Sequence, residues 1–208
     1  MKTLILKAKD FKEVDGYKEY QGKEDLTNFE GNLEFEADLG WMKFLRLKVS
    51  GYIWIKAGDS IEAGDSIEAG DWIKAGDSIE AGGSIEAGGS IEAGDSIEAG
   101  GSIEAGGWIE AGGSIEAVRG GITAGLTITC EGLLKFKLRL FAGVAPYSWE
   151  ENASNKVTCG KVEGNVVYGD VEETGLPEDK VDEAKASQSK VVKVKLTGGE
   201  VVQGELVE

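Results

Sequence analysis

Isoleucine recurs at every sixth position through the middle of the chain. Starting from Val49, the series continues at Ile55, Ile61, Ile67, Ile73, Ile79, Ile85, Ile91, Ile97, Ile103, Ile109 and Ile115. A spacing of six does not fit an α-helix, because about 3.6 residues per turn would distribute these side chains around the whole helix. It fits an extended chain, in which residues two apart share a face. In the repeated word Ile-Glu-Ala-Gly-Asp-Ser, isoleucine and alanine are therefore predicted to point inward, and glutamate and serine outward.

Glycine ends every predicted strand of the repeat and is followed only by Asp or Gly. These glycines are Gly58, Gly64, Gly70, Gly76, Gly82, Gly88, Gly94, Gly100, Gly106 and Gly112. Such pairs reach positive φ at little cost, so each is predicted to turn the chain through a corner. Short strands joined by corners predict a parallel β-solenoid whose coils stack about 4.8 Å apart. After Ala117 one residue is inserted, and the register resumes at Ile122, Ile128, Leu134 and Leu140.

Exceptions to the repeated word recur at intervals of three words or multiples of that interval. They are Trp54, Trp72 and Trp108, and Lys56 and Lys74. Asp59, Asp77 and Asp95, at a place where the word has either Asp or Gly, keep the same interval. An interval of three words predicts a coil with three sides. We therefore predict an all-β fold, a triangular parallel β-solenoid of about five coils over residues 49–142. An N-terminal cap is predicted at 1–48, and a C-terminal β-rich cap or small domain at 143–208.

Both flanks are predicted to be rich in strands. The segments MKTLILKA and GNLEFEADLGWMKFLRLKV are expected to form strands around a polar stretch from Lys9 to Asn28. On the C-terminal side, KVTCGKVEGNVVYGDVEE predicts strands with glycine turns. A polar connector follows, with a short helix predicted to begin near Pro177, and then a hairpin that turns at Gly198-Gly199.

A triangular coil of six-residue words resembles the left-handed parallel β-helix family. In that family a small residue follows the inward aliphatic residue after four places, whereas Ala63 follows Ile61 after two. The resemblance implies the architecture and leaves the handedness open. The enzymes of this family are acyltransferases and carbonic anhydrases that depend on histidine, which this chain lacks. The wording IKAGDSIEAGGSIEAGG also resembles repeat proteins encoded by phages and their bacterial hosts, which implies a phage or prophage setting.

Composition narrows the range of functions. The formal net charge of −16 disfavours nucleic acid and anionic membranes as direct partners and favours a basic protein surface. The absence of histidine excludes histidine-based acid–base catalysis and histidine-ligated metals. Cys130 and Cys159 have no metal or redox spacing and are expected to be buried free thiols. Without an apolar run of ~18 residues or a secretory signal, a cytoplasmic location is expected, in the host cell if the protein is phage-encoded.

The outward glutamates form the first candidate site. Between Ile55 and Ala117, nine Glu, five Asp and two Lys give a net charge of −12. This corresponds to about one negative charge per 1.4 Å of axis, against about one per 1.7 Å in duplex DNA. One hypothesis is that the solenoid imitates the charge of a nucleic acid, and the other is that the acids only keep it soluble. The candidate residues are Glu62, Glu68, Glu80, Glu86, Glu92, Glu98, Glu104 and Glu110.

Stacking identical carboxylates has a predictable electrostatic effect. Neighbours one coil apart repel, so the pKa values of the glutamates are expected to be raised in the folded protein. Mild acid and added salt are therefore expected to stabilise the fold.

The tryptophan column forms the second candidate site. Trp54, Trp72 and Trp108 are predicted to share one side of the solenoid with Lys56 and Lys74. These rings either lie under a cap segment, pair with the same column of a second copy, or form a recognition face. The aspartates at the corners suit a turn, and no metal site, cofactor or catalytic residue is predicted.

Three functions remain open from the sequence. The first is a non-enzymatic acidic interaction protein of phage type that binds and inhibits a basic host protein, such as a nuclease or DNA-binding protein. It would act as a nucleic-acid mimic in an anti-CRISPR or similar counter-defence role. The second is a structural module that dimerises or stacks through the solenoid. The third is an enzyme seated in the C-terminal region.

Overall fold

The computed structural model describes residues 1–144 and 155–176, and the backbone of two later strands at 191–195 and 201–205. The chain forms two compact units, Met1–Gly175 and Leu176–Glu208. The second unit contains the predicted hairpin, in which β26 (Val191–Lys195) and β27 (Val201–Glu205) pair antiparallel. The helix predicted near Pro177 and the turn at Gly198-Gly199 lie outside the described residues.

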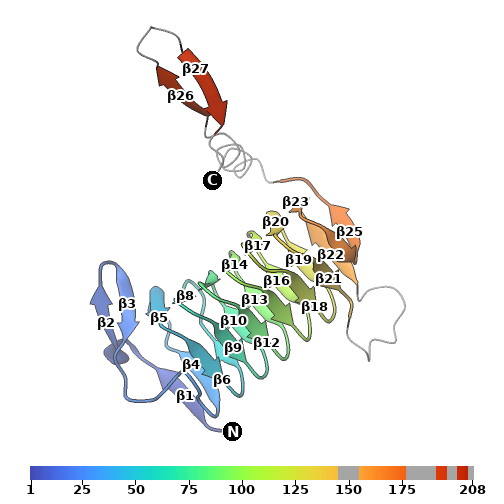
Figure 1. Cartoon of the computed structure of the whole chain (residues 1–208). Helices are drawn as coiled ribbons and strands as arrows, with labels where there is room; N and C mark the ends of the chain where they lie inside the picture. Colours follow the sequence, from blue (N-terminus) through green and yellow to red (C-terminus); the bar gives the residue numbers. More distant parts are fainter. Residues whose placement is uncertain (145–154, 177–190, 196–200, 206–208) are drawn as a thin grey trace. The chain divides into compact units, whose positions relative to one another are not determined.

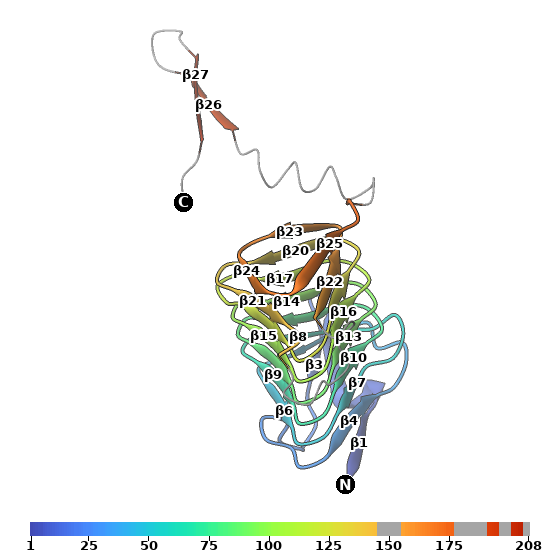
Figure 2. The same ribbon diagram turned by 90° about the vertical axis from the view of Figure 1, so that its right-hand side faces the viewer.

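The first unit is a parallel β-solenoid of about six turns, with three sheets and roughly 19 residues per coil. Figure 1 shows the coils stacked side by side from the blue N-terminal strands to the orange β25. In Figure 2, β9, β15 and β21 lie on one side of the coils and β10, β13 and β16 on the other, with β14, β17 and β20 between them. The predicted triangular, all-β solenoid is confirmed. The turns exceed five because both flanks add strands to the same three sheets.

From β4 onward, each of the three sheets takes every third strand of the chain. In stacking order, sheet A contains β1 (Thr3–Leu6), β4 (Asn32–Phe35), β7 (Ile53–Trp54), β10 (Ile73–Ala75), β13 (Ile91–Ala93), β16 (Ile109–Ala111), β19 (Ile128–Cys130), β22 (Lys156–Cys159) and β25 (Asp170–Glu173). Sheet B contains β2 (Phe11–Val14), β3 (Tyr17–Tyr20), β5 (Trp41–Phe44), β8 (Ser60–Ala63), β11 (Ile79–Ala81), β14 (Ile97–Ala99), β17 (Ile115–Ala117), β20 (Leu133–Phe136) and β23 (Lys161–Glu163). Sheet C contains β6 (Leu47–Val49), β9 (Ile67–Ala69), β12 (Ile85–Ala87), β15 (Ile103–Ala105), β18 (Ile122–Ala124), β21 (Leu140–Ala142) and β24 (Val166–Tyr168).

The core is a set of isoleucine columns, one behind each sheet. Each repeat isoleucine from Ile61 to Ile115 has 0% of its surface exposed and lies against the isoleucine of the next coil. The alanine two residues later also points inward. Burial of one such isoleucine is worth about 1.5–3 kcal/mol, so the repeated column is the main source of stability.

The coil is three words long through the regular part, as predicted. Ile73 pairs with Ile91, and Ile91 with Ile109. The inserted residue after Ala117 lengthens the next coil by that residue, so that Ile103 pairs with Ile122. The predicted continuation of the register beyond the insertion is therefore confirmed.

The prediction that the register continues unchanged to Ile55 and Val49 is wrong. Ile73 pairs with Ile53 instead of Ile55, and the Lys74 partner is Trp54. Ile55 therefore lies two residues out of the isoleucine column, and Val49 pairs with Ala69 rather than with an isoleucine. The two additional residues fall in the turn around Gly58, which has a φ of +80°. Both Ile53 and Ile55 point inward, so a six-residue count cannot distinguish them.

The prediction that the repeat glycines provide positive φ at the corners is wrong for all but one of them. Among the glycines that end the repeat strands, only Gly58 has a positive φ. The reason for glycine is the close approach of successive coils. A Cβ atom on Gly88 would overlap the carbonyl oxygen of Gly70, and one on Gly106 would overlap that of Gly88. Glycine therefore allows the corners to stack at the strand spacing.

Two of the repeat serines are also placed differently from the prediction. Ser60 and Ser78 are buried, at 3% and 7% exposure, instead of pointing fully outward. The Oγ of Ser60 accepts a hydrogen bond from the backbone N–H of Ser78 (3.2 Å), and Ser96 Oγ accepts one from Ser114 (3.2 Å). The hydroxyl thus satisfies a backbone donor of the next coil where the strand begins.

The polar stretch Lys9–Asn28 contains an unpredicted hairpin, in which β2 and β3 pair antiparallel. Its turn is Asp15-Gly16, with φ values of 48° and 86°, a strong hairpin signal that the sequence analysis left unused. Aromatic rings of this region meet at the N-terminal end of the solenoid core. Phe44 lies 5.9 Å from Phe35 and 6.0 Å from Phe11, with the rings edge to face. This cluster closes one end of the apolar interior.

The stacking role of glycine makes a testable prediction. Gly88→Ala is expected to destabilise the protein by about 1–3 kcal/mol, because its Cβ would force adjacent coils apart. Gly64→Ala is the matched control, since its nearest contact would be the Leu45 carbonyl oxygen at 3.7 Å. Urea unfolding of the two variants measures the difference. Equal losses of stability in both would contradict the proposed reason for glycine.

Candidate functional site

The predicted glutamates lie on all three outer sides of the solenoid, in columns set by strand pairing. Sheet B carries the longest acidic run, which in stacking order reads Glu19, Lys43, Glu62, Glu80, Glu98, Glu116, Lys135 and Glu163. The column of sheet C is Lys48, Glu68, Glu86, Glu104, Thr123, Phe141 and Tyr168. The column of sheet A is Glu34, Trp54, Lys74, Glu92, Glu110, Thr129 and Thr158.

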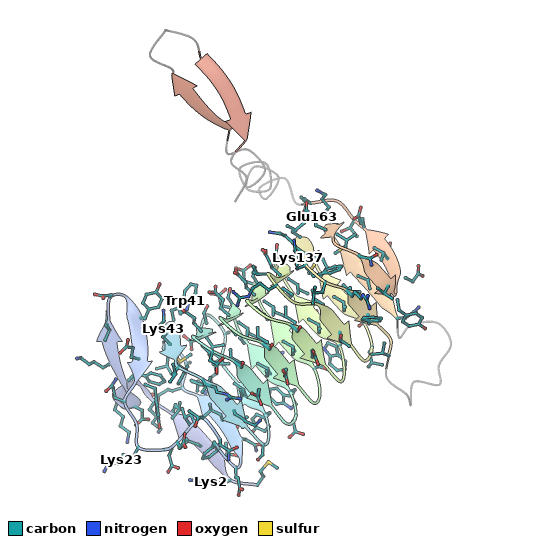
Figure 3. All side chains as sticks on the ribbon, in the orientation of Figure 1. Lys2, Lys23, Trp41, Lys43, Lys137 and Glu163 are labelled. Carbon is teal, nitrogen blue, oxygen red and sulfur yellow. The ribbon has the colours of Figure 1, made fainter. Side chains whose placement is uncertain are left out.

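Basic side chains neutralise the ends of the acidic run on sheet B. Lys43 binds Glu62 (2.8 Å), and Lys135 binds Glu116 (2.7 Å). The two central glutamates, Glu80 and Glu98, form no ion pair with any described residue. In Figure 3, Lys43 lies near the N-terminal end of the solenoid, and Lys137 and Glu163 lie near the other end. The negative charge of this side is therefore concentrated in its middle.

The pKa shifts of two glutamates, Glu80 and Glu68, follow from the burial and the charges around each carboxylate. The pKa of Glu80 is raised, first because its carboxylate is partly buried and then because Glu98 and Glu62 repel it. Glu68 behaves in the opposite way, because hydrogen bonds from Lys48 and Arg46 lower its pKa. The predicted rise is thus confirmed at Glu80 and wrong at Glu68, where two cations not anticipated from the repeat reach the carboxylate.

The predicted tryptophan column is correct for two of its three members. Trp72, Ser90 and Trp108 stand on successive coils of sheet A, since Ile73 N–H bonds to Ser90 O and Ile91 N–H to Trp108 O. The register shift moves Trp54 beside Lys74 instead of Trp72. Lys56 is likewise displaced and lies at the corner against Gly76. Trp54 and Trp108 are 39% and 44% exposed.

Tyr52 takes the place expected for Trp54, and sequence analysis missed it. Its ring stacks on Trp72 with a centroid separation of 4.4 Å and an interplanar angle of 3°. The Tyr52 hydroxyl donates a hydrogen bond to Glu34 (2.6 Å), which fixes the ring. The signal was present in the letters Tyr52-Ile53-Trp54-Ile55, where an aromatic residue precedes each of two inward isoleucines.

A cavity of about 620 Å³ opens between Trp72 and Trp108. Its floor is Gly88, Gly89 and Ser90, residues too small to fill the space between the two indole rings. Lys74 and Glu92 pair with each other at its rim. The predicted candidates Trp72, Trp108, Lys74 and Glu92 are therefore brought together, whereas the remaining glutamates are distributed around the solenoid.

The corner aspartates align as predicted but form no metal site. Asp77 N–H bonds to Asp59 O, and Asp95 N–H to Asp77 O (both 3.2 Å). Asp59 is buried, with a pKa raised chiefly by desolvation, and its Oδ1 accepts a hydrogen bond from Gly40 N–H. Within residues 1–144 and 155–176, no group of three or more acidic or cysteine side chains is placed to hold a metal ion.

Both cysteines are buried and outside any disulfide, as predicted. Burial, followed by repulsion from Glu173, raises the pKa of Cys159 to about 11. Because the thiolate is the reactive form, this thiol is protected in the folded protein.

Comparison of the chain with protein-family models, curated proteins and solved structures gives no significant match. No helix in the described part of the chain is long and apolar enough to cross a membrane. The proposed function therefore rests on the fold and on the side-chain geometry.

The opposite pKa shifts of two glutamates predict opposite mutational effects. At neutral pH, Glu80→Gln is expected to stabilise the protein by a few tenths to about 1 kcal/mol, because it removes a partly buried, repelled charge. Glu68→Gln is expected to destabilise it by a similar amount, because it removes two cation contacts. Denaturant unfolding at neutral pH measures both, and shifts of the same sign would refute the assignment.

The pH dependence of the two variants follows from the same shifts. A raised pKa means that the Glu80 penalty disappears as pH falls through that pKa, so the advantage of Glu80→Gln should vanish in acid. The lowered pKa of Glu68 means that its contribution is present at neutral pH and is lost as pH falls through the lowered value. Unfolding curves across the acid range check this convergence.

The burial of the cysteines predicts slow thiol chemistry. In the native protein, Ellman's reagent is expected to react with Cys130 and Cys159 orders of magnitude more slowly than in denaturant. Rapid native labelling at Cys159 would contradict its assigned environment.

Proposed function

We propose that the protein is a non-enzymatic acidic interaction protein that binds, and thereby inhibits, a basic protein surface of the kind that holds nucleic acid. The observation that carries this proposal is the unneutralised pair Glu80 and Glu98 in the centre of the run on sheet B. These carboxylates repeat at the strand spacing of about 4.8 Å on a rigid support. A basic groove would relieve their mutual repulsion, which supplies a driving force for binding.

The distribution of charge along the chain supports this proposal. Residues 55–117 hold −12 of the total charge of −16, so the rest of the chain is nearly balanced. The central coils thus present a charge density close to that of duplex DNA, about one charge per 1.7 Å. Because the acids occupy three sides, one groove can contact only part of them, and sheet B is the side with the longest run.

The resemblance of the repeat wording to phage and prophage proteins supports a biological setting for such an inhibitor. In that setting the bound surface belongs to a host nuclease or DNA-binding protein, and the protein acts in counter-defence, as anti-CRISPR proteins do. The host cytoplasm is then the expected location.

This function predicts a complex that weakens as salt is added and that duplex DNA dissociates by competition. Immobilised protein should retain basic proteins from a host lysate, and both added salt and duplex DNA should elute them, because they screen or replace the carboxylates. For a partner identified by mass spectrometry, Glu80→Gln with Glu98→Gln should weaken binding by about 2- to 30-fold.

Sheet C supplies the matched control, since Glu86→Gln with Glu104→Gln removes the same charge from another side. Equal weakening by both double variants would show that net charge alone is recognised. A complex indifferent to salt and DNA would overturn the proposal.

A second candidate, self-assembly by stacking, is favoured by the C-terminal end of the solenoid. The last strands of sheets A and C leave apolar side chains exposed, with Val167 at 49%, Tyr168 at 51% and Val171 at 37%. Edge strands with exposed apolar groups pair readily with another chain. Light scattering should then show multimers that Val171→Lys dissociates, whereas the first function predicts a monomer or dimer.

A further inference from the structure

The aromatic column on sheet A lacks one ring. Tyr52, Trp72, Ser90 and Trp108 occupy the same place on four successive coils, directly before the inward isoleucine. The first two rings stack in parallel, 4.4 Å apart. At the next coil Ser90 leaves a space, and Trp108 borders that space from the far side. We call this space the Trp slot.

The size of the Trp slot is fixed by the solenoid. Its two tryptophans are two coils apart, so their rings are separated by about 9–10 Å along the axis. A group at the midpoint lies about 4.5–5 Å from both ring centroids. This is within the range of about 6 Å for a cation over an aromatic face, and at the short end of the aromatic stacking range. A flat cation at the midpoint can therefore lie within cation–π range of both rings at once.

The charges around the Trp slot determine which kind of flat group it would bind. At the rim, Lys74 is already bound to Glu92, and Asp71 has no ion-pair partner among the described residues. The adjacent position along the glutamate column is Glu110, and the surrounding coils are strongly acidic. A cation is thus favoured over a neutral ring or an anion. Among side-chain cations, the guanidinium is planar, weakly hydrated and able to stack, whereas an ammonium is compact and strongly hydrated.

We propose that the Trp slot binds the guanidinium group of an arginine on the basic partner, stacked between Trp72 and Trp108 with its N–H groups directed to Asp71. This inference rests on the proposed function and adds a contact on sheet A to the contact with the acidic run on sheet B. The slot is prepared for binding, because Glu34 fixes Tyr52 and Tyr52 covers the second face of Trp72. Binding therefore orders few side chains.

The test uses labelled hexa-arginine and hexa-lysine peptides of equal charge and the full chain. Fluorescence anisotropy at physiological ionic strength should show tighter binding of hexa-arginine. Trp108→Ala should reduce that affinity by about 3- to 30-fold and leave the hexa-lysine affinity nearly unchanged. Indole N–H resonances of Trp72 and Trp108 should shift on titration with hexa-arginine.

Two further variants separate the slot from general effects. Trp54→Ala removes an exposed tryptophan outside the slot and should leave the arginine preference intact. Ser90→Trp should fill the slot and abolish the preference while the protein stays folded, because the chain already accommodates tryptophan at this place on two coils. Circular dichroism and the urea midpoint confirm the fold of each variant.

The possible failures are distinguishable. Equal binding of both peptides to the wild type, with salt sensitivity, would overturn the arginine slot and leave the acidic interaction surface standing. An equal loss in Trp54→Ala and Trp108→Ala would also overturn the slot. Binding of neither peptide would count against both proposals. Wild-type dimers that Trp108→Ala dissociates would identify a second copy as the occupant and overturn the assignment to arginine.

Discussion

In-register stacking of parallel coils is the constraint on which the structure depends. Because the coil and three copies of the repeated word have the same length, each residue lies against its own kind one coil away. Isoleucine on isoleucine gives a continuous apolar column, and the serine hydroxyl meets a serine N–H. Glycine allows the backbones to approach closely at the corners. The same rule places glutamate on glutamate, so the order that builds the core also creates electrostatic repulsion on the surface.

The surface chemistry follows from where this order is interrupted. Lysines at the ends of the run on sheet B bind the terminal glutamates and leave the central pair exposed to each other. On sheet A, two tryptophans replace two serines of the regular repeat, and the serine that remains between them leaves a cavity. The regular coils supply a rigid frame with known spacing, and the exceptions supply the recognition chemistry. A binding site on such a frame changes little in geometry on binding.

The repeat was sufficient to predict the fold, the coil length and the inward isoleucines, because periodicity directly reports which side chains share a face. It was insufficient at Ile55, since two inward isoleucines separated by one residue offer two equally good registers. That ambiguity displaced Trp54 and hid Tyr52. The roles of glycine and serine were also missed, because both arise from contacts between coils and not from the local chain. For the same reason, the cations beside Glu68 could be found only in three dimensions.

The near-identity of successive coils makes the length of this molecule a discrete quantity. Deletion or duplication of one three-word segment, for example between Ile79 and Ile97, rejoins identical neighbours and needs no new packing. Each such event changes the distance between the two ends of the solenoid by about 4.8 Å. Because a whole coil is added or removed, each sheet still faces the same side. The reach of the solenoid therefore changes in fixed steps of one coil.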